Sequence, residues 1–235
     1  MGAHMEQELT IWNYLKSKGL TDQGVAGLMG NLYAESKLSP INLQDTSNKH
    51  LAMTDEDYTK AVDNGSYKNF IRDSAGYGLA QWTYWKRKQN LLYFAQSKKT
   101  SVGDLLMQLE FLYLELSQSY PRVLNELKTT RSVLSASNAV LLQFEKPKVQ
   151  DEAVQDRRFN YSKMFYDKYG TKSGVRIGIT TSDLHLREGA GTQYKSLGVM
   201  PKGSQVTIIS ETEGWLRVSS CKLGKLGYCS SAYIK

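Results

Sequence analysis

The spacing of apolar residues changes once along this chain, near residue 169, and this change constrains the fold more than any other feature. Before it, apolar residues recur at helical intervals. Leu105, Leu109, Leu112 and Leu116 follow one another at i, i+4, i+7 and i+11, directly after the plausible N-cap Asp104. After it, short β-rich runs alternate with turn residues. The sequence therefore predicts a helical domain followed by a separate β domain.

The first part is expected to contain six or seven helices. A second helical stripe is formed by Val133, Ala136, Val140 and Phe144. The segment 39–76 is polar and has little periodicity, which predicts loops, turns or a small hairpin. Long loops inside compact domains are often functional, so this segment is a candidate part of a site.

The second part reads as an all-β module of about 60 residues. Its expected strands are Gly178–Thr181, Leu184–Arg187, Gln205–Ser210, Trp215–Val218, Gly227–Tyr228 and Ala232–Ile234. Between the two parts, Gly170–Gly174 has the composition of a flexible linker. We therefore predict an α+β multidomain protein with a mainly helical domain at 6–169, a linker at 170–174 and a β domain at 175–235.

Charge and composition limit the possible partners. The chain has 30 Lys and Arg against 23 Asp and Glu, a formal net charge of +7. Residues 175–235 hold eight basic and four acidic side chains, which is +4 of this total. Such a balance favours a polyanionic partner: nucleic acid, an anionic membrane face or a charged cell wall. No apolar run approaches the ~20 residues that span a bilayer, so membrane insertion is not expected.

Two further features concern the cysteines and the N-terminus. Cys221 and Cys229 are too few for a disulfide scaffold and lack the companions of a zinc site. They are either reduced or paired across a short loop. Residues 1–5 read as a vector remnant, and no secretory signal pattern follows them.

Glu35 is the strongest catalytic candidate. Thr21 can cap a helix at its N-terminus. The buried face of this helix is marked by Val25, Leu28, Met29 and Leu32. Glycines three residues apart, at Gly24, Gly27 and Gly30, would let another helix approach closely. Glu35 lies three residues after Leu32, on the buried side of the C-terminal end. Burial and the negative end of the helix dipole both raise the pKa of a carboxyl, so Glu35 can act as a general acid. The alternatives are a satisfying partner such as Asn31 or Tyr33, or a frayed helix end.

The segment Asp73–Trp82 is a candidate sugar-binding segment. A tight Gly-x-Gly turn leads into Gln81 and Trp82, and aromatic rings beside amides are suited to a sugar-binding groove. The turn is not a phosphate loop, because the dinucleotide pattern is incomplete and no strand precedes it.

Three motifs together carry a family resemblance. Gly27–Ser36 (GLMGNLYAES), Gly76–Thr83 (GYGLAQWT) and Phe144–Pro147 (FEKP) resemble the phage tail lysozyme family of the lysozyme-like superfamily, over about residues 9–169. The first two also resemble motifs of goose-type lysozymes and lytic transglycosylases. The resemblance implies cleavage of the β-1,4 bond between N-acetylmuramic acid and N-acetylglucosamine, with Glu35 as the acid. It also implies that Ser36, Tyr77, Gln81 and Trp82 bind substrate.

The second carboxylate of such an enzyme has two candidates, Asp73 and Asp45. A glycoside hydrolase needs a second carboxylate to attack the sugar or to activate water. Asp45 follows Glu35 by ten residues, and Asp73 adjoins the Gly-Tyr-Gly turn. Each can instead form an Asx turn. A lytic transglycosylase would need neither, because the sugar's own 6-hydroxyl attacks.

The aromatic and basic run from Trp82 to Lys88 could bind DNA. We favour another interpretation, in which Trp85 packs into the core with Leu91, Leu92 and Phe94 while the basic side chains form a solvated helix face. Glu110 and Glu115 belong to the amphipathic leucine helix and need no catalytic role.

The β module resembles the bacterial SH3 domain over about residues 175–235. The resemblance rests on Leu184–Thr192, Leu197–Gly203, Gly214–Val218 and Gly227–Ile234. His185-Leu186-Arg187 stands where these domains usually have Asn-Val-Arg, and Tyr228 stands where they have Trp. These domains commonly bind peptidoglycan, and His185 is expected to be structural rather than a metal ligand.

The two resemblances together predict a peptidoglycan-degrading endolysin or autolysin with a wall-targeting module. Its partner would be the peptidoglycan of a Gram-positive wall, without nucleic acid, membrane insertion, cofactor or metal, and we expect a monomer. Synthesis in the host cytoplasm without a signal peptide and action at the wall are expected. The alternatives are a lytic transglycosylase and a catalytically inactive wall-binding protein.

Overall fold

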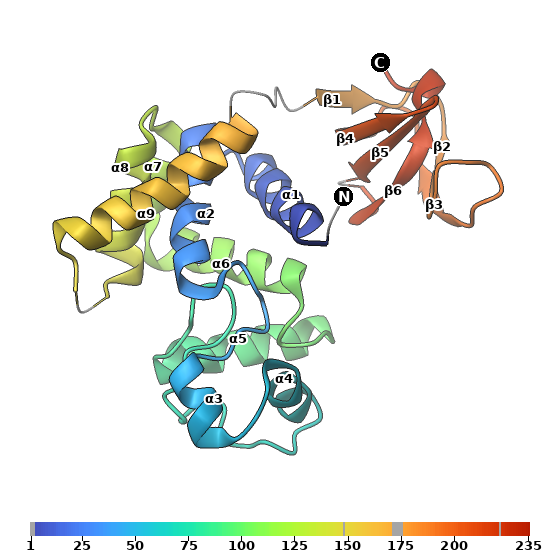
Figure 1. Ribbon diagram of the computed structural model, residues 1–235. Helices are drawn as coiled ribbons and strands as arrows, with labels where there is room; N and C mark the ends of the chain where they lie inside the picture. Colours follow the sequence, from blue (N-terminus) through green and yellow to red (C-terminus); the bar gives the residue numbers. More distant parts are fainter. Residues whose placement is uncertain (1–2, 148, 171–175, 221) are drawn as a thin grey trace. The chain divides into compact units, whose positions relative to one another are not determined.

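The computed structural model describes residues 3–147, 149–170, 176–220 and 222–235, which form two compact units, Met1–Thr171 and Lys172–Lys235. Each unit has its own hydrophobic core. The first is helical and the second is built from β-strands (Figure 1), so the predicted fold class is confirmed. Apart from Gly170, the predicted linker lies outside the described residues.

The helical unit has nine α-helices over its described residues, more than the six or seven predicted. They are α1 (Ala3–Ser17), α2 (Asp22–Ser36), α3 (Asp45–Leu51), α4 (Asp55–Asp63), α5 (Trp85–Lys98), α6 (Leu105–Ser119), α7 (Pro121–Thr129), α8 (Val133–Ala139) and α9 (Glu152–Phe165), with π-helical segments η1 (Val140–Glu145) and η2 (Tyr166–Gly170). The prediction of loops for 39–76 was wrong at α3 and α4. These helices are too short to show periodicity, although Thr54 caps α4, which buries Tyr58 and Val62.

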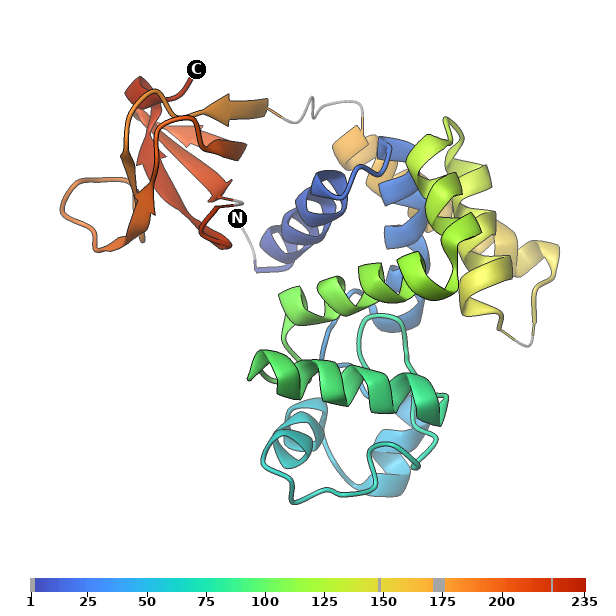
Figure 2. The same ribbon diagram turned by 180° about the vertical axis from the view of Figure 1, so that it is seen from behind.

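Helix α2 is the centre of this unit. As predicted, Thr21 caps it by accepting a hydrogen bond from the Gly24 N–H (2.9 Å). A Cβ on Gly27 would lie 2.8 Å from the backbone of Ala136 in α8, and one on Gly30 would lie 2.6 Å from the Cα of Ser162 in α9. Glycine at these two positions therefore lets α8 and α9 approach the α2 backbone, and both views show α9 crossing α2 (Figures 1 and 2).

Helix α6 lies beside the lower end of α2, and α5 lies below α6 (Figure 1). Asp104 caps α6 by accepting from the Met107 N–H, and the predicted leucines of α6 face the core. The second predicted stripe is also buried at Ala136, Val140 and Phe144, and its helix widens into η1 from Val140 onward. Phe144 and Glu145 are the last two residues of this segment.

The second unit is a six-stranded antiparallel sheet in the order β1-β4-β5-β6-β2-β3. Its strands are β1 (Arg176–Ile179), β2 (Leu184–Arg187), β3 (Ser196–Met200), β4 (Gln205–Thr212), β5 (Trp215–Ser220) and β6 (Lys225–Ser230). Register shifts in the β2/β3 and β4/β5 pairs mark irregularities in the sheet. Strand β3 was not predicted, and the strand expected at Ala232–Ile234 is instead mostly the 3₁₀ turn Ser231–Tyr233.

Cys229 lies in strand β6, which pairs with β5. It is a buried free thiol whose cross-strand neighbour is Leu216, and burial raises the pKa of this thiol to about 11. Cys221 is outside the described residues. Cys229 therefore serves as a small apolar side chain in the core of the β unit.

Candidate functional site

Glu35 occupies the last turn of α2, with its side chain 20% exposed. Its partner is Arg158 of α9, whose Nη2 forms an ion pair with Oε1 of Glu35. Arg158 is itself held by a hydrogen bond from Nη1 to the Asn31 carbonyl oxygen (2.9 Å). The Asn31 amide in turn donates to the Ser137 carbonyl oxygen (3.1 Å). Neither Asn31 nor Tyr33, the partners considered from sequence, bonds the Glu35 carboxyl in the described structure.

Glu145, at the end of η1, belongs to the same charged cluster. Burial and the negative charge of Glu35 raise the pKa of Glu145 to about 8, against the opposing effects of Arg87 and Arg158. Over the described residues, its Oε1 is buried without a hydrogen-bond partner, and so is the Nε of Arg158. Orphaned buried polar atoms are rare in folded proteins, and here an acceptor and a donor occur together. The raised pKa favours the protonated form of Glu145, close to a second carboxyl.

Arg87 and Glu115 form the base of this cluster. Arg87 makes a two-pronged ion pair with Glu115, from Nε at 2.7 Å and Nη2 at 2.8 Å. The guanidinium also lies over the Phe144 ring, 5.0 Å from its centroid. The same Glu115 carboxylate accepts from the Trp82 indole N–H (3.0 Å). The ion pair thus joins α5 and α6 next to η1. Glu115 belongs to the leucine helix as expected, but it lies on the buried side.

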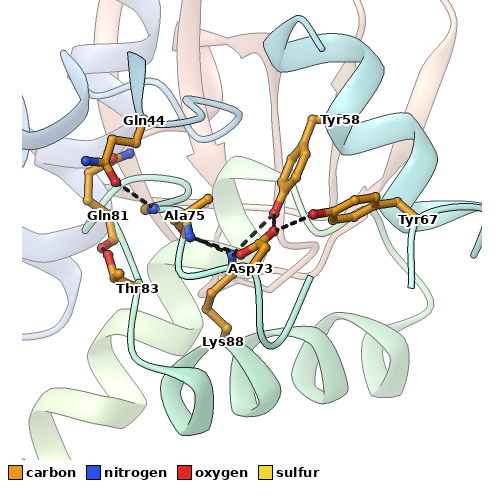
Figure 3. A network of polar contacts seen from close by, with 9 residues as sticks. Gln44, Tyr58, Tyr67, Asp73, Ala75, Gln81, Thr83 and Lys88 are labelled. Atoms are coloured by element: carbon orange, nitrogen blue, oxygen red, sulfur yellow. Dashed lines mark hydrogen bonds and ion pairs between the residues drawn. The ribbon is translucent and has the colours of Figure 1, made fainter. Parts of the chain in front are cut away.

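Asp73 lies in a separate, buried network (Figure 3). It accepts hydrogen bonds from Tyr58 (2.5 Å), Tyr67 (3.1 Å) and the Ala75 N–H (3.0 Å), and it pairs with Lys88 Nζ at 2.5 Å. Its side chain is 2% exposed and that of Lys88 is 0% exposed. The bond to Ala75 is the Asx turn considered as the alternative. Four donors already occupy the oxygens of this buried carboxylate, so the structure argues against Asp73 as the second catalytic group.

The structure also places most of the other predicted site residues away from solvent. Tyr77 and Trp82 are fully buried, and Tyr77 shares a hydrogen bond with Thr59 (2.7 Å). Ser36 is buried and donates to the Leu79 carbonyl oxygen (2.9 Å), which connects the end of α2 to the segment after the Gly-x-Gly turn. These three side chains are therefore packed inside the helical unit and are not open to solvent.

Gln81 and Asp45 remain partly or fully exposed. Gln81 is half-buried, and its amide donates to Oδ1 of Asn42 (2.9 Å), so it holds the neighbouring loop. Asp45 is exposed at the start of α3. In the described structure neither contacts Glu35, so the structure brings Glu35 together with Arg158 and Glu145 rather than with the predicted aspartates.

Leu91, Leu92 and Phe94 pack against the core as predicted, but Trp85 and Lys88 at the start of α5 do not follow the prediction. Trp85 is 48% exposed, whereas Lys88 shares the buried face with Leu91 and Ala95. A buried lysine is tolerated because Asp73 and the Ala75 carbonyl oxygen satisfy its ammonium group.

Glu145, Arg158, Arg87 and Glu115 are the residues that sequence reasoning missed. One signal was present: Glu145 lies in the FEKP motif that supports the family resemblance. Over the described residues, no group of three or more His, Cys, Asp or Glu is placed to hold a metal ion. None of the described helices is long and apolar enough to cross a membrane.

The fold and the glutamate cluster define a two-unit protein in which a lysozyme-like helical domain precedes an SH3-like β unit. The family model described as phage tail lysozyme matches residues 6–169, and that of the bacterial SH3 domain matches residues 182–235. The chain belongs to the phage tail lysozyme family and carries a bacterial SH3 domain.

One curated relative comes from Bacillus subtilis (strain 168). This protein is provisionally named N-acetylmuramoyl-L-alanine amidase YrvJ, and it is 38% identical over 62 residues. The match covers 26% of this chain and 12% of the relative, so the chain spans only a small part of that protein's length.

Proposed function

We propose that this chain is a peptidoglycan hydrolase that cleaves the β-1,4 bond between N-acetylmuramic acid and N-acetylglucosamine, with Glu35 as the general acid. The observation that carries this proposal is the pairing of Glu35 with Glu145 in one charged cluster, inside the region that matches the phage tail lysozyme family. Glycosidases use such a pair. One carboxyl protonates the leaving oxygen, and the other, ionised, attacks the sugar or activates water.

In this proposal Glu145 takes the place of Asp73 and Asp45 as the second carboxylate. Glu35 is partly exposed, so it can reach a glycosidic oxygen, and Arg158 orients it. The raised pKa of Glu145 means that the cluster keeps a proton near neutral pH. This raised pKa also favours a second arrangement, in which Glu145 supplies the proton and Glu35 is the ionised partner.

The direct test compares Glu35→Gln and Glu145→Gln with the parent in clearing Gram-positive cell walls. Glu35→Gln should fold normally and lose about three orders of magnitude of activity, since an amide cannot protonate the leaving oxygen. Glu110→Gln is the matched control, because Glu110 is an exposed acid of α6 paired with Lys98, and it should stay within about twofold. Activity of Glu35→Gln within tenfold of the parent would contradict the assignment.

A substrate with a good leaving group separates the two arrangements. An aryl glycoside of a short glycan needs no protonation of its leaving group, so the variant that lacks the general acid should recover on it. Recovery of Glu35→Gln supports Glu35 as the acid. Recovery of Glu145→Gln alone assigns that role to Glu145.

Mass spectrometry of the released fragments tests the bond and the reaction. Hydrolysis by a muramidase leaves N-acetylmuramic acid at the reducing end, and a lytic transglycosylase leaves a 1,6-anhydro end. An amidase, the activity in the name of the Bacillus subtilis relative, would release stem peptides with intact glycan. The absence of any fragment would indicate a wall-binding protein without catalysis.

The β unit is proposed to bind the wall. It has a hollow of about 320 Å³ whose lining includes His185, Arg187, Trp215 and Tyr233, and residues 175–235 carry a net +4 charge. Both features suit an anionic polymer with peptide and sugar groups. We propose that the partner is Gram-positive peptidoglycan and that the chain acts on it as a monomer.

A further inference from the structure

A second hollow lies on the helical unit and is not explained by the glutamate cluster. It has a volume of about 700 Å³ and is lined by Ile71, Arg72, Ser74, Thr83, Tyr84 and Trp85. We call it the Tyr84–Trp85 pocket. Its size is within the range of small-molecule and sugar sites.

The two aromatic residues of this pocket are exposed. Tyr84 is 57% exposed and Trp85 48% exposed, and their ring centroids are 5.7 Å apart at an interplanar angle of 55°. Over the described residues, neither the Tyr84 hydroxyl nor the Arg72 guanidinium has a hydrogen bond or ion pair with another residue. Two adjacent exposed aromatic rings with unused polar groups around them mark a binding surface.

The pocket is preformed, because the buried network of Asp73 joins its walls. One wall is the 71–74 segment, and Asp73 within it pairs with Lys88 in the first turn of α5. The other wall is 83–85, which leads directly into that turn (Figure 3). The Asp73–Lys88 ion pair therefore fixes the spacing of the two walls, and a site held in advance loses little entropy on binding.

The same turn of α5 connects the pocket to the glutamate cluster. Arg87 follows Trp85 by two residues and packs on Phe144, the neighbour of Glu145. The pocket and the cluster thus both border the first turn of α5, which rises about 5.4 Å, so a strand of several sugars bound at Glu35 and Glu145 is long enough to reach the exposed rings.

We propose that the Tyr84–Trp85 pocket binds a sugar of the glycan strand, one or more positions away from the bond that is cleaved. The inference rests on the proposed function. The apolar face of an N-acetylated sugar can stack on Tyr84 or Trp85, while Ser74 and Thr83 offer hydroxyls and Arg72 can pair with a muramyl or stem-peptide carboxylate.

Nucleic acid also stacks on aromatic rings, but the charge at this site favours the sugar. Arg87 and Lys88 are used in ion pairs with Glu115 and Asp73, so they do not present free positive charge to a phosphate backbone. Among the residues that the structure describes, Arg72 and Lys86 are then the two cations left near the pocket for phosphate contacts, which supply most of the affinity of nucleic-acid binding proteins.

The test uses the full chain carrying Glu35→Gln, with and without Trp85→Ala or Tyr84→Ala. Binding of chitohexaose and of purified peptide-free glycan strands is followed by calorimetry. Each aromatic substitution should weaken binding about tenfold, as expected for a central aromatic contact. Tyr93→Ala is the control, because Tyr93 is an equally exposed tyrosine of α5 outside the pocket, and it should leave binding unchanged.

The second part of the test measures the kinetics of the aromatic variants in the active chain, which keeps Glu35. Trp85→Ala should raise KM for long glycan strands about tenfold while leaving kcat/KM on the shortest cleavable fragment within about twofold. Unchanged binding and KM in both aromatic variants, in a chain that still cleaves glycan, would overturn the subsite and leave the proposed function intact. Full activity of Glu35→Gln with lost glycan binding in Trp85→Ala would instead contradict only the proposed chemistry. Binding of oligo(dT), but not glycan, that depends on Trp85 would show a nucleic-acid site and overturn the proposal.

Discussion

Removing the buried cation of the Asp73 network should destabilise the helical unit strongly. In Lys88→Met the side chain keeps its length, but the ammonium group that contacts Asp73 at 2.5 Å and the Ala75 carbonyl oxygen at 2.8 Å is lost. The Asp73 carboxylate then remains buried with only neutral donors from Tyr58, Tyr67 and Ala75. Breaking one partner of a buried pair typically costs about 3–5 kcal/mol of the free energy of unfolding.

This loss can be measured by thermal unfolding followed at the helical circular dichroism band. For a domain of this size, 1 kcal/mol corresponds to roughly 2–4 °C, so Lys88→Met should lower Tm by roughly 6–20 °C. Lys86→Met is the control, because Lys86 is exposed in the same turn, and it should change the free energy of unfolding by less than about 0.5 kcal/mol.

A double-mutant cycle shows whether the charge itself is responsible. Asp73→Asn removes the buried negative charge, so the double variant with Lys88→Met should be more stable than Lys88→Met alone. Asp73→Asn should also retain activity at temperatures where it is folded, which distinguishes it from Glu35→Gln. A Lys88→Met protein as stable as the parent, or a folded Asp73→Asn protein with a thousandfold loss of activity, would refute this reasoning.

Two further predictions concern pH and the division into units. The pKa of Glu145 in the folded state is raised to about 8, so the folded state binds this proton more tightly than the unfolded state. The free energy of unfolding should therefore fall as pH rises from about 4.3 towards 8. Urea titrations of Glu145→Gln should show a smaller fall over the same pH range. A pH dependence identical in both proteins would contradict the assignment. A fragment ending at Tyr169 should fold alone and cleave soluble glycan at near the parental rate but clear intact walls more slowly, because the β unit no longer concentrates it there; equal rates on walls would remove the targeting role.

The sequence by itself determined the elements whose signals are local. The cap at Thr21, the glycine spacing of the second helix and the leucine stripe of the later helix follow from contacts within a few residues. The change from helical to strand patterning near residue 169 and most of the β-strands also follow from such local signals. The place of Glu35 at the end of its helix is of the same kind, because helix geometry alone sets the direction of a side chain relative to the apolar face.

Tertiary structure decided which distant residues meet. Arg158 is 123 positions from Glu35, and no local pattern predicts that pairing. Periodicity describes which side of a helix is apolar, but it assigns every charged residue to water by default. The burial of Lys88 and the exposure of Trp85 reverse that default because Asp73 supplies a buried partner for the ammonium group. Glu145 acquires its raised pKa in the same way, since only the packing of η1 against α2 and α7 buries its carboxyl and brings it close to Glu35.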